Sequence, residues 1–187
     1  MFNTLAKIGK SLNEFNVTWA VGASLMLNQY RLIDKPNDID LIVVLADIHK
    51  ADMILKSLGE KKKWEETSTY GTKYFYEYII DGIDIDVMAG LAVNHDEGVF
   101  DYIFNDQSVS EFEQIGGINI PFTSLEDWYV LYQLMPNREP KVKMIEDYLI
   151  SEGIGRKGLL ERALGGNLPV EVRKRVEKIF ELSDISG

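Results

Sequence analysis

Apolar residues follow two different spacings in the first third of the chain, and each spacing predicts a different element. Between Thr4 and Phe15 they recur every three or four residues, which predicts a helix. VTWAV then predicts a short strand, and GASLMLNQY a turn that leads into a second helix. The segment DIDLIVVLA has too many consecutive apolar residues for a half-exposed strand, so we expect a strand in the centre of a sheet.

Later segments continue this mixture of helices and strands. DIHKADMILKSLG predicts a helix with Asp47 at its N-cap and Gly59 at its end. TKYFYEYII and IDIDVMAG, joined by Asp81-Gly82, are typical of a β-hairpin. Between Gly90 and Gln114 no clear pattern predicts an element. GGINIPF predicts a last strand, and TSLEDWYVLYQLM a helix that follows it.

The order of these elements predicts an α+β fold, a mixed sheet with flanking helices. From Lys141 onward the pattern is helical to the end, with breaks at EGIG and GGNLP. We therefore expect a main domain over residues 1–150 and a helical C-terminal extension over residues 151–187.

Composition narrows the class of protein. Hydrophobic residues make up 45% of the 187 residues, enough to fill a core. The net charge of −10 argues against broad, non-specific binding of nucleic acid, which depends on Lys and Arg. There are no cysteines, which excludes disulfides and thiolate sites. No segment is typical of a signal peptide or long enough to cross a membrane, so we expect a cytoplasmic protein without membrane contact.

Two aspartates open the central strand. Asp38 and Asp40 are two positions apart, so alternation along a strand puts both carboxylates on one face. Carboxylates this close repel each other, and removing them from water is unfavourable. A hard cation relieves both effects, and Mg²⁺ prefers carboxylate oxygens together with phosphate oxygens of a substrate. The pair therefore indicates a magnesium site.

The hairpin offers a third carboxylate. Asp84 and Asp86 again share one face of a strand. If this strand lies beside the first, one of these aspartates can complete a site for two metal ions, which can hold the attacking and leaving oxygens of a phosphoryl transfer. Strand spacing alone leaves both Asp84 and Asp86 open.

The turn VGAS is suited to a phosphate. Gly22 has no side chain, so the backbone can approach a ligand closely. The N-terminus of the following helix offers free N–H groups, and the Ser24 hydroxyl is a further donor.

These motifs together resemble the nucleotidyltransferase superfamily, with its polymerase-beta-like fold. Gly-x-Ser at a helix start, Asp-x-Asp-Leu on a strand and a later apolar-Asp-apolar strand carry the resemblance, which extends over about Val17 to Leu149. The sequence especially resembles small bacterial nucleotidyltransferase-like proteins and antibiotic nucleotidyltransferases. INIPFTSLEDWYVLYQLM and NREPKVKMIEDYL are similar to the family's closing strand and the helices after it.

The resemblance implies roles for individual residues. Asp38 and Asp40 would hold both Mg²⁺ ions, and Asp86, favoured over Asp84 because DVM matches the family pattern, would hold the catalytic ion and help to activate the acceptor hydroxyl. Gly22 and Ser24 would contact the triphosphate. The family often has Arg-x-Thr where this chain has DKPN, so Lys35 would supply the positive charge there. Lys73, on the hairpin, is a further candidate for phosphate binding.

The predicted function is Mg²⁺-dependent transfer of a nucleoside monophosphate, AMP from ATP or the corresponding monophosphate from another NTP, to a hydroxyl of a small molecule, a protein or an RNA end, with release of pyrophosphate. The alternative is a catalytically silent binding module or antitoxin-type partner protein. A glycosyltransferase also uses Asp-x-Asp, but it needs neither Gly-x-Ser nor the second acidic strand. A dehalogenase-type phosphatase is excluded because its apolar strand precedes the aspartates.

Basic residues in the last third have two interpretations. Arg138, Lys141 and Lys143 would either point to the active site or form a solvated face. Residues 155–178 contain seven basic and three acidic side chains, a local balance of +4, which makes the C-terminal helices a candidate surface for a protein partner. His95, in a loop after the acidic strand, is a candidate for the substrate pocket.

Overall fold

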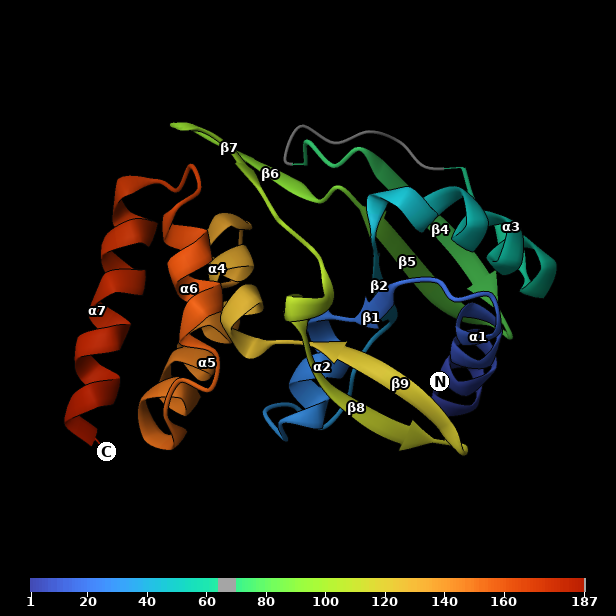
Figure 1. Cartoon of the computed structure of the whole chain (residues 1–187), viewed down its shortest axis with the longest axis horizontal. Coiled ribbons are helices and arrows are strands. Elements are labelled where there is room, and N and C mark those ends of the chain that lie inside the picture. The colour runs from blue at the N-terminus through green and yellow to red at the C-terminus, as the bar shows by residue number, and fades with distance from the viewer. Residues whose placement is uncertain (64–69, 187) are drawn as a thin grey trace. The chain divides into compact units, whose positions relative to one another are not determined.

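The first part of the chain is built around a mixed β-sheet (Figure 1). In the computed structural model, which describes residues 1–63 and 70–186, seven strands form one sheet in the order β3-β4-β5-β2-β1-β9-β8. The strands are β1 (Trp19–Val21), β2 (Ile39–Val43), β3 (Glu60–Lys61), β4 (Tyr74–Ile80), β5 (Ile83–Ala89), β8 (Val109–Ile115) and β9 (Ile118–Thr123). The pairs β1–β9 and β2–β5 are parallel, and the other neighbours are antiparallel.

The two strands at the centre of the sheet are the most apolar. All of β1 is buried, and in β2 every residue except Asp40 is buried. Burial of such side chains supplies most of the free energy that favours folding. The prediction of a central strand over DIDLIVVLA is thereby confirmed, and the one polar position in β2 becomes conspicuous.

Helix α1 (Phe2–Glu14) packs against this sheet through its predicted apolar face. Leu5, Ile8 and Leu12 are fully buried. A Cβ at Gly9 would lie 2.3 Å from Ile120 Cδ1, so a larger residue there would displace the Ile120 side chain of β9. Phe15, expected on the same face, follows the last helical residue and is 59% exposed.

Helix α3 (Ile48–Leu58) follows a short 3₁₀ turn, η1 (Leu45–Asp47). Asp47 stands at its N-cap position, but its side chain does not cap the helix. Instead it accepts a hydrogen bond from the Thr18 backbone N–H at 2.9 Å and pairs with Lys50. The position of the helix was predicted correctly, whereas Asp47 serves to join the helix to the residue before β1.

The predicted hairpin is present as β4 and β5. Asp81 and Gly82 have φ angles of 52° and 77°, as a two-residue hairpin turn with left-handed central residues requires. Residues 91–114, for which no element was predicted, contain β6 (Ala92–His95), β7 (Gly98–Asp101), the 3₁₀ turn η2 (Asp106–Ser108) and most of β8. Strand β8 joins β9 through Gly116-Gly117, again with two positive φ angles.

The described residues divide into two compact units. Unit 1 holds residues 1–63, 72–91 and 103–124, with the seven-stranded sheet, α1, α2 (Ala23–Gln29) and α3. Unit 2 holds residues 70–71, 92–102 and 125–186, with the β6–β7 ribbon, α4 (Leu125–Leu134), α5 (Glu139–Glu152), α6 (Lys157–Leu164) and α7 (Val170–Ser186). This division falls earlier in the chain than the boundary expected near Ser151, and the domain limits 1–150 and 151–187 stay a prediction.

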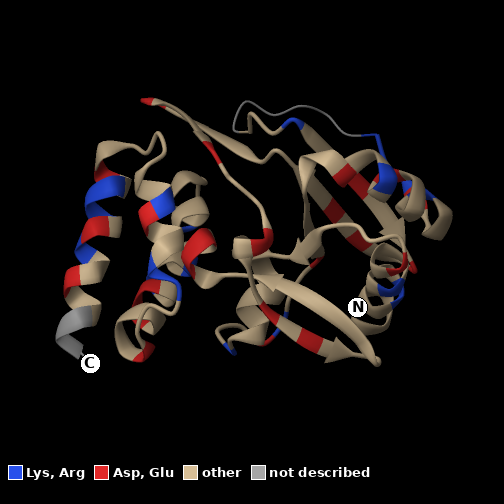
Figure 2. Ribbon diagram, in the orientation of Figure 1, with Lys and Arg blue, Asp and Glu red and all other residues tan. Residues whose placement is uncertain are grey.

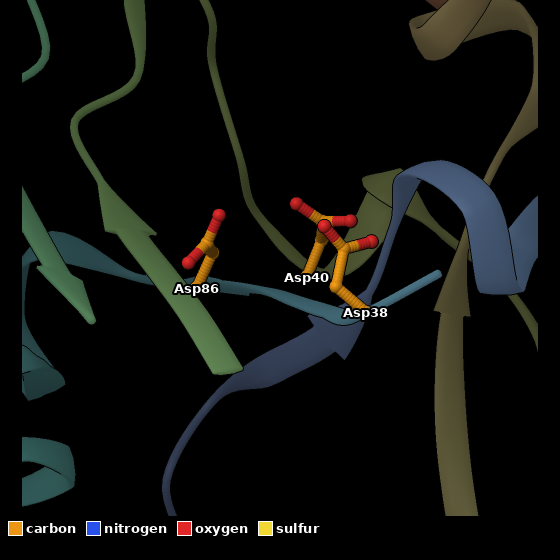
Figure 3. Close-up of side chains that lie close together, drawn as sticks. All are labelled: Asp38, Asp40 and Asp86. Carbon is orange, nitrogen blue, oxygen red and sulfur yellow. The ribbon is translucent and has the colours of Figure 1, made fainter. Parts of the chain in front are cut away.

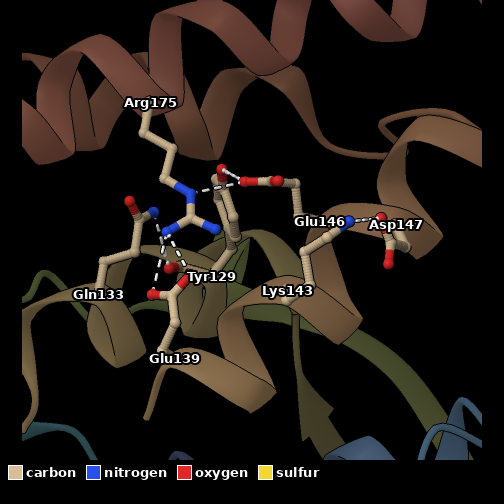
Figure 4. Close-up of polar contacts among 7 residues, drawn as sticks. All are labelled: Tyr129, Gln133, Glu139, Lys143, Glu146, Asp147 and Arg175. Carbon is tan, nitrogen blue, oxygen red and sulfur yellow. Dashed lines mark hydrogen bonds and ion pairs between the residues drawn. The ribbon is translucent and has the colours of Figure 1, made fainter. Parts of the chain in front are cut away.

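Ionic contacts hold the helices of unit 2 together. Arg175 on α7 donates from Nε to Glu146 of α5 at 2.6 Å and from Nη1 to Glu139 at 2.9 Å. Tyr129 of α4 donates its hydroxyl proton to the same Glu146 at 2.8 Å, so Glu146 of α5 contacts both α4 and α7 (Figure 4). Within residues 1–63 and 70–186, no helix has both the length and the apolar character of a membrane span.

Candidate functional site

Three aspartates, one each from β2 and β5 and one from the residue just before β2, meet on one face of the sheet in unit 1. Asp40 of β2 stands opposite Asp86 of the parallel strand β5, and Asp38 lies two residues before Asp40. Each offers a carboxylate oxygen, and these oxygens lie within 4.8 Å of one another. Figure 3 shows all three side chains pointing to the same side of the sheet. We call these residues the aspartate triad.

The separation of the triad oxygens is suited to a small hard cation. Two ligands on opposite sides of an octahedral Mg²⁺ ion are about 4.2 Å apart, because each Mg–O bond is about 2.1 Å long. Oxygens within 4.8 Å of one another can reach such an ion with only a small movement of the side chains. All three residues are partly buried, so each still has access to solvent or a ligand.

The charge of the triad is unfavourable without a cation. Burial, followed by the charges of Asp38, Glu77 and Asp84, raises the pKa of Asp86 to about 6. Such a shift is typical of functional sites, where like charges are held together for a ligand of opposite charge.

The turn before α2 contacts the triad directly. The Gly22 backbone N–H donates to the Asp40 carbonyl at 2.9 Å, and the Ser24 hydroxyl donates to Asp38 Oδ1 at 3.3 Å. Ser24 is buried. The structure therefore brings Gly22 and Ser24 to the aspartates, as expected, and Ser24 already has a carboxylate as its partner.

Ala23 has an unusual backbone conformation in this turn. Its φ angle is 47°, in the left-handed region, where a residue with a Cβ is less stable than glycine by about 1 kcal/mol. Strained residues of this kind persist where the surrounding structure requires the turn. The strain at Ala23 indicates that the position of the turn beside Asp38 is well determined.

The two candidate aspartates of β5 have different surroundings. Asp86 belongs to the triad, whereas Asp84, on the same face, forms an ion pair at 2.5 Å with Lys62 and has a side chain that is 65% exposed. The geometry thus places Asp86, which the family pattern favoured, with Asp38 and Asp40.

The two candidate lysines are exposed. Lys35 is in the loop before Asp38. Lys73 precedes β4, and its backbone N–H donates to the Gly90 carbonyl at 3.1 Å, so it stands beyond the C-terminal end of β5. Among the described residues, no hydrogen bond joins either lysine side chain to a triad carboxylate. Their roles in phosphate binding stay predictions.

Two charged residues near the triad were not predicted. Glu77 of β4 stands directly opposite Asp86, and the Lys62 backbone N–H donates to the Glu77 carbonyl at 2.8 Å. Tyr78 faces α3, so alternation along β4 puts Glu77 on the opposite face, with the triad. Only the register of the hairpin reveals this position, and no motif in the sequence marks Glu77 or Lys62.

His95 and the basic residues of the last third belong to unit 2. The Glu97 backbone N–H donates to His95 Nδ1, so Nε2 carries the proton that it donates to the Asn167 carbonyl at 3.0 Å. Both ring nitrogens therefore have structural partners. Lys143 pairs with Asp147, and Arg138 stands at the N-cap position of α5.

Several basic side chains of residues 155–178 are used within unit 2. Arg162 binds Asp127 at 3.2 Å, Arg173 donates to the carbonyls of Leu164 and Gly166, and Arg175 binds Glu139 and Glu146. On α7, basic and acidic residues alternate along the helix (Figure 2). These pairings reduce the excess positive charge available to a partner, and a partner surface on these helices stays a proposal.

The chain is similar to solved structures, but its sequence matches no protein-family model and no curated protein. A solved structure of a presumed nucleotidyltransferase from Thermotoga maritima is 25% identical, with a TM-score of 0.59 over 79% of this chain and 91% of that one.

Two further solved structures are similar to this chain over nearly all of their own length. ANT(2″)-Ia, in complex with adenylyl-2″-tobramycin, is 17% identical, with a TM-score of 0.56 over 96% of this chain and 98% of that one. The lincosamide antibiotic adenylyltransferase LnuA, with lincomycin bound, is 16% identical, with a TM-score of 0.51 over 77% of this chain and 95% of that one. At these identities the likeness concerns the fold.

Proposed function

The chain has the fold of the nucleotidyltransferase superfamily, as its sequence motifs implied, and on this basis we propose that it is a Mg²⁺-dependent nucleotidyltransferase. The reaction would transfer a nucleoside monophosphate, AMP from ATP in the first instance, to a hydroxyl group of an acceptor and release pyrophosphate. The observation that carries this proposal is the aspartate triad, three carboxylates within 4.8 Å on the face of a sheet next to a Gly-x-Ser turn.

Each group has a proposed task. Asp38, Asp40 and Asp86 would hold two Mg²⁺ ions, which when bound would neutralise negative charge on the transferred phosphate. Gly22 and Ser24 would lie against the triphosphate, and Lys35 and Lys73 would add positive charge. Asp86 would also receive the proton of the acceptor hydroxyl.

The similar solved structures support nucleotidyl transfer as the class of reaction but do not identify the acceptor. ANT(2″)-Ia was solved with an adenylylated antibiotic, and LnuA is an adenylyltransferase with an antibiotic bound. An adenylyl donor and a small hydroxyl-bearing acceptor are therefore the first compounds to test. The acceptor of this protein is a small molecule, a protein or an RNA end.

The test is calorimetric titration with non-hydrolysable analogues of the four NTPs, with and without Mg²⁺. Wild type is compared with Asp38→Asn/Asp40→Asn, and with Asp101→Asn/Asp106→Asn as a control that changes the net charge equally at two exposed positions. We expect Mg²⁺-dependent binding, strongest for the ATP analogue, that the control retains and the triad variant loses by at least about tenfold.

Two outcomes would count against the proposal. If no NTP analogue binds in the presence of Mg²⁺, the protein is better described as a silent binding module of the same fold. If the triad variant binds as well as wild type, the triphosphate is held elsewhere. Once an acceptor is identified, turnover by Asp40→Ala or Asp86→Ala would contradict the assigned roles.

A further inference from the structure

Strand β5 presents two aspartates on the same face, and only one of them joins the triad. Residues 84 and 86 are separated by two positions, so their side chains point to the same side of the strand. In the pairing of β2 with β5, Ile39 stands opposite Ile85, and Asp38 and Asp84 are the residues that precede these two. Asp84 thus stands beside a triad residue, yet its carboxylate is outside the group of oxygens within 4.8 Å.

Lys62 is the residue that holds Asp84. Its Nζ lies 2.5 Å from Asp84 Oδ1. Its backbone N–H donates to the Glu77 carbonyl at 2.8 Å, which fixes Lys62 next to β4, in register with Glu77. Glu77 in turn stands opposite Asp86. A row of four charged residues therefore crosses this face, from Asp40 and Asp86 through Glu77 to the lysine.

The pairing of Lys62 with Asp84 is informative. Glu77 is its neighbour in the row, but the ammonium group reaches past it to Asp84. Without that contact, Asp84 would be a fourth carboxylate beside Asp38, and a divalent ion in the triad would attract it. Mg²⁺ and Mn²⁺ bind more tightly as carboxylate ligands are added, so an extra ligand would change the affinity of the site.

We propose that Lys62 is a positioning residue that keeps Asp84 out of the metal site, so that Asp86 alone of the two β5 aspartates serves as third ligand. This inference rests on the proposed function, because it needs the triad to bind a divalent ion. The pair of Lys62 and Asp84 adds no net charge to the site. Asp38, Asp40 and Asp86 would then be the carboxylates that hold divalent ions, leaving coordination positions for phosphate oxygens.

A double-mutant cycle with Mn²⁺ alone as the probe tests the inference. Free Mn²⁺ is measured by electron paramagnetic resonance, at low ionic strength, over wild type, Lys62→Met, Asp84→Asn and the double variant. Both residues are partly exposed, so the variants should fold, which circular dichroism checks. Lys63→Met makes the same change of charge one position along the chain and controls for net charge.

We expect the effect of Lys62→Met on Mn²⁺ affinity to depend on whether Asp84 is present. Lys62→Met should tighten Mn²⁺ binding by about tenfold when Asp84 is present, because Asp84 becomes a ligand, and by no more than about threefold in the Asp84→Asn background, where only the charge changes. Asp84→Asn alone should weaken binding by no more than about threefold, and Lys63→Met should have a smaller effect than Lys62→Met.

Other patterns would overturn the inference. Equal effects of Lys62→Met in both backgrounds would mean that the lysine acts only through its charge, and a loss of binding in Asp84→Asn as large as in Asp86→Asn would make Asp84 itself a ligand. Failure of the proposed function looks different. In that case wild type binds no Mn²⁺, or Asp86→Asn binds it as well as wild type, and the inference falls with it.

Discussion

Asp86 lies where its own negative charge is unfavourable. Burial, Asp38, Glu77 and Asp84 raise its pKa to about 6, and Lys62 opposes them only in part. In the unfolded chain the same carboxyl titrates near its ordinary value of about 4. A group whose pKa is raised by folding stabilises the folded state when protonated. This contribution is complete below pH about 4 and is lost as the pH rises through about 6.

Asp86→Asn should therefore stabilise the metal-free protein at neutral pH. The amide resembles the protonated carboxyl, so we expect the free energy of unfolding at pH 7.5 to rise by about 1 kcal/mol, after allowance for solvent screening. The gain should shrink steadily as the pH falls from 6 towards 4. Urea unfolding in the presence of EDTA at several pH values measures it. A gain independent of pH would show that the charge of Asp86 is not its cause.

The triad residues could be predicted from one sequence, because Asp-x-Asp stands before an apolar run and the family pattern surrounds Asp86. The position of Glu77 also follows from the sequence, since the two-residue turn Asp81-Gly82 sets the register of the hairpin and puts Glu77 opposite Asp86. Lys62 reaches the site because β3 pairs with β4. No local pattern marks this pairing, so Lys62 needed the structure.

At the scale of elements, one aspartate joins a helix to two strands. Asp52 of α3 accepts hydrogen bonds from Tyr78 of β4 and from Lys61 of β3, each at 2.6 Å, and from Lys56 one turn later. The Lys61 ammonium also lies 3.2 Å from the centre of the Tyr76 ring. Burial raises the pKa of Asp52, but these hydrogen bonds outweigh it and lower the pKa to about 2.

Asp52→Asn should weaken the attachment of α3. A carboxyl whose pKa is lowered by folding stabilises the protein above its ordinary pKa of about 4 and loses this effect as the pH falls through about 2. At pH 7 we expect the free energy of unfolding to fall by about 2 kcal/mol. Denaturant unfolding of both proteins between pH 2 and 7 measures the difference, which should decrease towards pH 2. A constant difference would point to packing instead of charge.

Elements with strong local signals were predicted, and those defined by a distant neighbour were missed. The hairpin of β4 and β5 is marked by Asp81-Gly82 between strand-forming residues. In contrast, β8 has the sequence VSEFEQI, with two glutamates and no fully buried position, and its pairing with β9 includes a shift of register. Its strand conformation follows from β9 beside it, which no local pattern in β8 reveals.

At the scale of the whole molecule, each unit has its own core and its own buried polar contacts. In unit 2, Asp127 is only 5% exposed, accepts a hydrogen bond from the Tyr102 hydroxyl at 2.7 Å and pairs with Arg162. Burial raises its pKa to about 6, although Tyr102 and Arg162 act in the opposite direction. The acidic pair in the SLED motif thus has a structural task in unit 2, since Glu126 also accepts the Arg156 backbone N–H at 2.8 Å.

Asp127→Ala should be among the more destabilising single substitutions in unit 2. It removes the carboxylate that compensates a largely buried arginine, and such a loss reduces the free energy of unfolding by about 3 kcal/mol. Asp147→Ala is the matched control, because it breaks an exposed pair with Lys143 and should change stability by less than about 0.5 kcal/mol. Thermal unfolding of the full chain compares them. Equal effects would contradict this account of Asp127.

The parallel pairing of β1 with β9 has a consequence for synthesis on the ribosome. One side of β1 is filled at once by β2, but the other side waits for a strand about 100 residues later, where the Thr123 hydroxyl donates to the Val21 carbonyl at 2.9 Å. Until that segment leaves the exit tunnel, the nascent chain carries an open, apolar strand edge, which is prone to wrong pairing. Cotranslational closure of this sheet therefore comes late.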